Sequence, residues 1–241
     1  MLGTCRWLAL EVTALDSVAE FYRTHLDLET IRADEREHVL DAGGESSLIL
    51  RRPDGVPRGG LHTHYAFSCP EDAYDAWYAR LDADFDLEEV DFGSMRSLYL
   101  YDPEGNCVEI ASASRPADGE VPILSGIFEV VFEVEALPAA EEFYGDLGFE
   151  VVDRGEERRR TRLTNGPLDI ELWEPHLGLA DARGGVHVDV GIAADDPEQA
   201  ADSVAARSTR RELVDGGVRI RDPDGHYLTL LDQRNAMTPT N

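Results

Sequence analysis

Apolar and polar residues alternate in short runs along most of the chain, and after some of these runs the pattern changes to a helical repeat. Four runs begin such a succession, at 6–12, 61–69, 126–134 and 185–192. The helical segments that follow them lie at 17–26, 71–81, 138–147 and 197–207. Alternation with a period of two predicts strands, whereas apolar residues three and four apart predict helices. Because further alternating runs follow each helix, the pattern predicts an α+β fold of four modules, each a strand, a helix and three strands.

The second half of the chain repeats the first. FYRTHLDLET at 21–30 returns as FYGDLGFEVV at 143–152, and DPEGNCVEI at 102–110 returns as DPDGHYLTL at 222–230. The two repeats have almost the same offset, which indicates a tandem duplication. A stretch rich in Pro, Gly and acidic residues separates the copies, as a linker would. The predicted organisation is one domain over 1–115, a linker over 116–122 and a second domain over 123–241, with two modules in each domain.

The charge of the chain restricts its partners. It has 49 acidic residues against 22 basic ones, every basic residue is arginine, and the formal net charge is −27. Such a field repels nucleic acids and anionic membranes, so we expect neither as a partner. The carboxylates are spread along the chain, which is typical of a solvated surface. Heavy acidity without lysine resembles the proteins of extreme halophiles, where concentrated salt screens repulsion between charges.

The remaining compositional signals favour a cytoplasmic protein. No stretch approaches the ~18–20 apolar residues of a membrane span, and the first residues lack the basic and then apolar order of a signal peptide. Cys5, Cys69 and Cys107 are scattered and form no C-x-x-C pair. We therefore expect reduced cysteines in the core rather than a disulfide framework. We expect the protein to be a monomer or a homodimer.

The repeated motifs carry a family resemblance. An F-Y helix motif and a D-P-x-G motif before the last strand, present in both halves, resemble the vicinal oxygen chelate superfamily. That superfamily includes glyoxalase I, extradiol dioxygenases and bleomycin-resistance proteins, and the resemblance covers nearly the whole chain. It implies two cupped mixed sheets with helices on the outer faces. It also implies that metal ligands lie on the first and last strands of each module.

Strand alternation shows which residues would face a cup at those positions. In the four modules they are Trp7 and Ile49, His64 and Glu109, Glu129 and Glu171, and His187 and Thr229. The number of residues between the two members is nearly the same in all four pairs, which supports the alignment of the modules.

The way in which the modules pair determines the site. If neighbouring modules within a half share a cup, the first half offers His64 and Glu109, and the second offers Glu129, Glu171 and His187. If the cups are swapped across the duplication, as in tandem glyoxalase I proteins, the second and third modules combine. That cup would hold a full ligand set, which is His64, Glu109, Glu129 and Glu171. The swapped pairing is the one we predict, because it leaves one complete cup and one without a ligand set.

The swapped cup predicts a metal-dependent chemistry. Three carboxylate oxygens and one imidazole nitrogen suit one divalent ion, such as Ni²⁺, Co²⁺, Mn²⁺, Fe²⁺ or Zn²⁺. By resemblance to glyoxalase I, the ion would polarise adjacent substrate oxygens, Glu109 would move a proton between neighbouring carbons, and Glu129 would be its counterpart across the metal. The predicted enzyme is a lyase or isomerase of glyoxalase I type. Its expected partner is a small-molecule substrate, the hemithioacetal of a 2-oxoaldehyde and a small thiol.

Two other functions stay open. An extradiol ring-cleaving dioxygenase would place two histidines and a glutamate at the positions of Glu129, His187 and Thr229, so two of its three ligands are missing. A metal-free binding protein of the bleomycin-resistance type would need an aromatic cup. The residues that could line it are Trp7, Trp173 and Tyr227.

Overall fold

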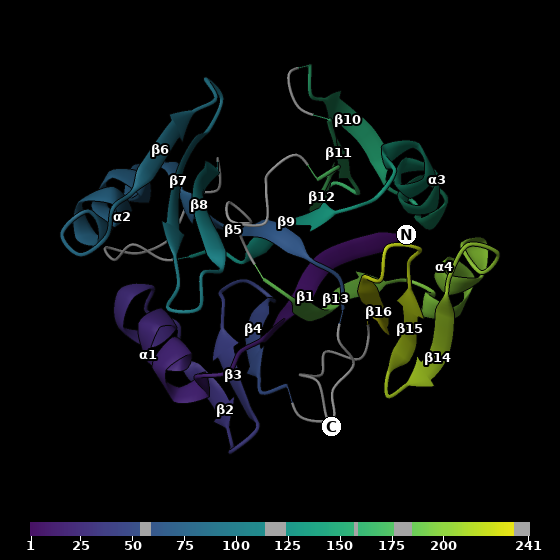
Figure 1. Ribbon diagram of the computed structural model, residues 1–241, viewed down its shortest axis with the longest axis horizontal. Coiled ribbons are helices and arrows are strands. Elements are labelled where there is room, and N and C mark those ends of the chain that lie inside the picture. Colours follow the sequence, from purple (N-terminus) through teal and green to yellow (C-terminus); the bar gives the residue numbers. More distant parts are fainter. Residues whose placement is uncertain (54–58, 114–123, 157–158, 176–184, 234–241) are drawn as a thin grey trace.

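The strands form two mixed sheets of eight strands each. The computed structural model describes residues 1–53, 59–113, 124–156, 159–175 and 185–233. Figure 1 shows the two sheets back to back, with the ends of each sheet curving away from the other sheet so that each sheet forms a cup. The prediction of an α+β fold with two cupped mixed sheets is confirmed.

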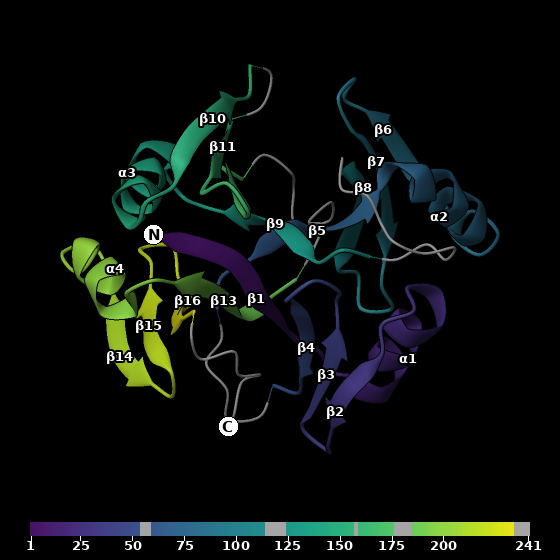
Figure 2. The same cartoon turned by 180° about the vertical axis from the view of Figure 1, so that it is seen from behind.

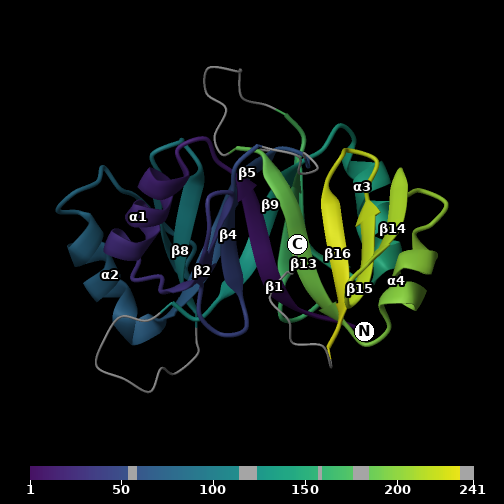
Figure 3. The ribbon, with the colours of Figure 1, turned by 90° about the horizontal axis from the view of Figure 1, so that it is seen from below.

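One sheet combines the first and fourth modules, and we call it the outer-module sheet. In spatial order its strands are β14 (Arg210–Val214), β15 (Gly217–Arg221), β16 (Tyr227–Asp232), β13 (His187–Ala194), β1 (Leu2–Glu11), β4 (Ser47–Arg51), β3 (Glu37–Asp41) and β2 (Thr30–Ala33). Figure 3 shows the central strands β4, β1, β13 and β16 side by side. The antiparallel pair β1 and β13 joins the two modules.

The other sheet combines the second and third modules, and we call it the inner-module sheet. Its strands are β10 (Glu150–Arg154), β11 (Arg160–Thr164), β12 (Asp169–Trp173), β9 (Ile127–Glu133), β5 (His62–Pro70), β8 (Cys107–Ala113), β7 (Arg96–Tyr101) and β6 (Glu88–Asp91). Each sheet therefore draws its strands from both halves of the chain, as the swapped pairing predicts. The linker expected at 116–122 lies outside the described residues, and the domain boundaries stay a prediction.

The helices cover the flanks of the sheets. They are α1 (Leu15–His25), α2 (Tyr74–Leu81, preceded by the 3₁₀ turn Glu71–Ala73), α3 (Leu137–Leu147) and α4 (Pro197–Ser203). Figures 1 and 2 show α1 and α2 on one side of the molecule and α3 and α4 on the other. On α3, Ala140, Phe143, Tyr144 and Leu147 are buried at a spacing of three and four residues. Fully burying a side chain such as Phe143 contributes about 1.5–3 kcal/mol, which stabilises the helix on the sheet.

The repeated F-Y and D-P-x-G motifs meet in space. The Tyr22 hydroxyl of α1 donates a hydrogen bond to Asp102 at 3.0 Å, and the Tyr144 hydroxyl of α3 donates one to Asp222 at 2.9 Å. In the first of these turns, Glu104 also accepts a hydrogen bond from the backbone N–H of Thr13 at 2.7 Å, just before α1. The turn that precedes the last strand of one module thus fixes the helix of the module before it, which ties the two sheets together in each half.

Candidate metal centre

Neighbouring strands of the inner-module sheet bring the predicted ligands together. Ala66 of β5 pairs with Glu129 of β9 on one side and with Glu109 of β8 on the other. Residues opposite one another in adjacent strands project to the same face of a sheet, so both carboxylates share a face. His64 lies two residues earlier on β5, and Glu171 of β12 pairs with the position two residues after Glu129. All four side chains therefore face one side of the sheet.

The four side chains meet in the inner-module cup. His64 Nε2 lies 3.2 Å from Glu109 Oε2 and 3.8 Å from Glu129 Oε1. Ligand atoms of His64, Glu129 and Glu171 all lie within 4.8 Å of one another. Each of the four residues is buried, with no more than 9% of its surface exposed. Glu109 joins this group through its contact with His64, and metal binding by the four residues stays a prediction.

Two arginines and a tryptophan contact the carboxylates of this cluster. Arg162 Nη2 lies 2.9 Å from Glu129 Oε2, and Arg160 Nη1 lies 2.6 Å from Glu171 Oε1. The Trp173 indole N–H donates a hydrogen bond to Glu171 Oε2 at 2.7 Å. Neither arginine is among the site residues predicted from the sequence. The available signal was their alternation in Arg-Thr-Arg-Leu-Thr at 160–164, which places both on one face of β11.

The two central carboxyl groups differ in acidity. Burial raises the pKa of Glu129, the negative charge of Glu109 raises it further, and the pKa lies well above the usual value although Arg162 opposes the shift. Burial also raises the pKa of Glu109, but the hydrogen bond and charge of His64 outweigh it, so this pKa lies below the usual value. Without an ion, Glu109 therefore keeps its negative charge at neutral pH more readily than Glu129 does.

The chemistry of the cluster fits a divalent ion. Glu109 Oε2 is buried, and the atom that faces it is His64 Nε2 at 3.2 Å, itself a predicted ligand atom. Buried carboxylates grouped this closely are unfavourable unless hydrogen-bond donors or a cation compensate their charge. The donor set of three carboxylates and one imidazole is typical of sites for Mn²⁺, Fe²⁺, Co²⁺, Ni²⁺ or Zn²⁺.

The outer-module cup has no such donor set among the described residues. The strand register places Trp7, Ile49, Asp189 and Thr229 at the matching positions. The Trp7 indole fills the space beside Gly191, where a Cβ would lie 2.4 Å from the ring. The Trp7 indole N–H and the Thr229 hydroxyl both donate to Asp189 Oδ2, at 3.2 and 2.6 Å. A single carboxylate with no imidazole or second carboxylate at the matching positions makes a poor divalent-ion site.

His187 does not face the outer-module cup, where we expected it. Asp189 pairs with Ala9 and His187 pairs with Leu10, so two steps along β13 match one step along β1. Such a β-bulge shifts the alternation of side chains by one residue. His187 therefore lies on the core side, fully buried, with its ring stacked on that of Phe132.

β5 contains the matching bulge. Its residues His62 and His64 pair with adjacent residues of β9, so His62 is buried on the core side while His64 faces the cup. By this register His62 matches His187, and His64 matches Asp189. Aligning His64 with His187 was wrong by two residues.

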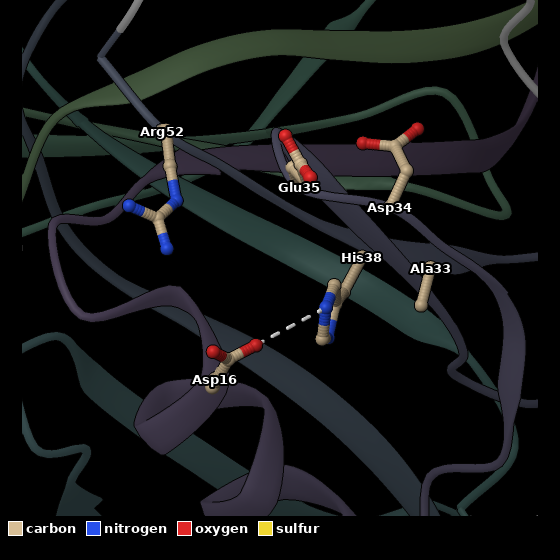
Figure 4. Close-up of a pocket in the computed structure, with 6 residues that line it drawn as sticks. All are labelled: Asp16, Ala33, Asp34, Glu35, His38 and Arg52. Carbon is tan, nitrogen blue, oxygen red and sulfur yellow. Dashed lines mark ion pairs between the residues drawn. The ribbon is translucent and has the colours of Figure 1, made fainter.

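A separate hollow of ≈ 580 Å³ lies beside α1. Figure 4 shows its lining residues, which are Asp16, Ala33, Asp34, Glu35, His38 and Arg52. His38 Nε2 lies 3.6 Å from Asp16 Oδ1, and the Asp16 side chain is 86% exposed. Since the hollow shares no residue with the His64 cluster and its carboxylates are solvated, we place the candidate site in the inner-module cup.

Comparison with solved structures identifies the fold. Glyoxalase I from Zea mays superposes with a TM-score of 0.68 at 20% identity, over 95% of this chain and 92% of that one. A proposed dioxygenase from Bacillus subtilis superposes with a TM-score of 0.73 at 17% identity, over 95% of this chain and 84% of that one. The chain has a glyoxalase-like fold.

The glyoxalase-like fold hosts several chemistries, so it leaves the activity to be argued from the site. No family model matches the sequence. Among the described residues of this glyoxalase-like chain, no helix is long and apolar enough to cross a membrane.

Proposed function

We propose that the protein is a divalent-metal-dependent enzyme of the vicinal oxygen chelate type, which isomerises the hemithioacetal of a 2-oxoaldehyde as glyoxalase I does. The observation that carries the proposal is the convergence of His64, Glu109, Glu129 and Glu171 in the inner-module cup. These are one nitrogen and three oxygen donors from four strands, and they lie on the concave face of a glyoxalase-like sheet.

The residues divide the work of a proton transfer. A divalent ion bound by this cluster would polarise the adjacent oxygens of the substrate and acidify the neighbouring C–H. Glu109, whose pKa lies below the usual value, accepts the proton from the carbon that bears the hydroxyl and the sulfur. Glu109 then returns this proton to the former carbonyl carbon, while Glu129, its counterpart across the cluster, moves the hydroxyl proton to the oxygen on that carbon, so that every proton is accounted for. The net change is an isomerisation to a 2-hydroxy thioester, and it needs no oxidant or reductant.

Ring cleavage by an extradiol mechanism is the alternative, supported by the superposition on the proposed dioxygenase from Bacillus subtilis. The ligand positions of such an enzyme argue against it. Glu129 lies in the inner-module sheet, whereas His187 and Thr229 lie in the outer-module sheet. The three positions therefore do not meet in one cup.

Metal analysis and two activity assays test the proposal. We expect about one divalent ion per chain in protein purified in about 2 M KCl, and isomerase activity on methylglyoxal mixed with a small thiol. Cleavage of catechol by the iron-loaded protein without isomerase activity would favour the dioxygenase. A protein that takes up no metal but binds small aromatic molecules would instead be a binding protein.

A further inference from the structure

Strand β11 directs two arginines at the carboxylates of the inner-module cup. Arg162 Nη2 lies 2.9 Å from Glu129 Oε2, and Arg160 Nη1 lies 2.6 Å from Glu171 Oε1. About a quarter of each arginine side chain is exposed, 28% for Arg160 and 27% for Arg162. A guanidinium stays protonated in a protein, so both groups keep a positive charge at the edge of the metal centre.

The arginines leave the proposed ligands able to bind an ion. Arg162 contacts Oε2 of Glu129, while Oε1 of the same carboxylate faces His64 at 3.8 Å. In Glu171 each oxygen has one hydrogen-bond donor, Arg160 or Trp173. A carboxylate oxygen has two lone pairs, so one donor does not prevent coordination.

The charge of the centre depends on these two residues. Carboxylates that bind a metal are deprotonated, so the three glutamates and a divalent ion alone would leave one negative charge. The two guanidiniums change the total to one positive charge. Each arginine also pairs with one further carboxylate, Asp169 at 2.6 Å from Arg162 and Asp153 at 2.8 Å from Arg160. Asp153 is 54% exposed and is therefore well screened by water, whereas Asp169 is 20% exposed and offsets part of the Arg162 charge.

We propose that Arg160 and Arg162 make the metal-loaded centre selective for an anionic ligand, one that presents two adjacent oxygens and carries a negative charge. This inference rests on the proposed metal-dependent function and narrows its substrate class. Aromatic side chains adjoin the cluster as well. The rings of Tyr99 and Trp173 stand edge-on to the His64 ring at centroid distances of 5.6 and 5.8 Å.

Glycolate and glycolamide are suitable probes, because they have nearly the same shape and adjacent oxygens but differ in charge. We expect calorimetry on the metal-loaded protein to show glycolate binding at least about tenfold more tightly than glycolamide, since one unit of charge acts at short range inside a buried site. We expect neither probe to bind measurably to the metal-free protein.

Arginine variants separate a charge effect from a structural one. In Arg162→Gln we expect metal affinity to rise by about tenfold, because a charge that repels the ion is lost. We expect the preference for glycolate to fall by about tenfold, because the same charge attracts the anion. In Arg162→Lys, which keeps the charge, both affinities should stay close to wild type. The control is Arg154→Gln, which removes a 62% exposed arginine of β10 that pairs with Glu141 outside the cup.

The outcomes distinguish this inference from the proposed function. If wild-type protein binds no divalent ion, both fail. If it binds one ion but does not prefer glycolate, this inference alone is wrong. If Arg162→Gln weakens metal and glycolate together, the arginine has only a structural role and the inference is wrong. Should Arg162→Gln fail to fold, Arg160→Gln provides the same test, because Trp173 still holds Glu171.

Discussion

Among single residues, His64 has the most distinct part in the inner-module cup, because it is the nitrogen donor among three carboxylates. We expect His64→Ala to weaken metal binding by more than the roughly 10–100-fold that is typical when a partner of a ligand is removed. A metal titration of the purified variant measures this. The structure offers a matched control at the same strand position of the other cup.

That control is Asp189→Asn, which preserves shape and removes a charge in the outer-module cup. Metal affinity should stay within about twofold of wild type, because Asp189 belongs to the other sheet and its partners there include Trp7, Thr229 and Arg219. If Asp189→Asn were the variant that came out metal-free, the proposed centre would be in the wrong cup.

His187 predicts an acid sensitivity of the fold. Burial, followed by the nearby charges of His226 and His62, lowers its pKa well below the usual value. The unfolded chain takes up a proton there near pH 6.5 while the folded protein stays neutral, so stability falls as the pH drops below about 6.5. At pH 5 this one site costs about 2 kcal/mol of unfolding free energy.

Urea unfolding at pH 7 and pH 5 measures that cost. His187→Phe keeps an aromatic ring against Phe132 and removes the titrating group, so its loss of stability between the two pH values should be smaller than that of wild type. An unchanged loss would show that other groups cause the acid sensitivity.

At the scale of elements, α1 depends on a residue that is distant in sequence. The Glu104 carboxylate accepts hydrogen bonds from the backbone N–H and the hydroxyl of Thr13 and from the backbone N–H of Ala14. These N–H groups lie at the start of the helix, where no partner within the helix is available. We expect Glu104→Ala to lower the free energy of unfolding by about 1 kcal/mol, as the loss of a capping group does.

Glu20→Ala on the same helix is the control, because it removes an exposed carboxylate whose partners among the described residues, Arg23 and Thr24, lie on its own helix. Surface pairs of this kind contribute at most about 0.5 kcal/mol. Equal losses of stability in the two variants, measured by urea unfolding, would show that Glu104 does not cap α1.

Elements also show how far the sequence could predict the site. Alternation identified Glu109, Glu129 and Glu171 on the concave face, because β8, β9 and β12 keep a regular period where those residues lie. It misplaced His187, because a β-bulge adds one residue to β13 and leaves no signal in the pattern of apolar and polar positions. The same alternation would have revealed Arg160 and Arg162.

The D-P-x-G and F-Y motifs could be recognised as repeats, but their physical role could not be predicted. The hydrogen bond from Tyr22 to Asp102 joins residues that are 80 positions apart. Its existence depends on how the modules pack, and no local pattern contains that information. The fold was predictable because the module pattern occurs four times, and each occurrence supports the others.

For the whole molecule, charge predicts a dependence on salt. The formal net charge of −27 makes the folded state repel itself in dilute buffer, and at about 1 M salt the screening length falls to ~3 Å. We expect the melting temperature to be clearly higher in about 2 M KCl than in about 0.1 M KCl. Sorbitol at equal osmolality is the control because it screens no charge. Equal melting temperatures in the two salt concentrations would exclude the halophilic interpretation.

The exchange of modules between the halves has an evolutionary consequence. A half-length ancestor could have completed its cups only by binding a second copy of itself, and the two cups of such a homodimer would have been identical. If the halves arose by duplication and fusion, as the repeated motifs predict, fusion would have removed that symmetry, because each cup would then be encoded by its own pair of modules. One cup could lose its donors and fill with Trp7 and its apolar neighbours while selection preserved the other.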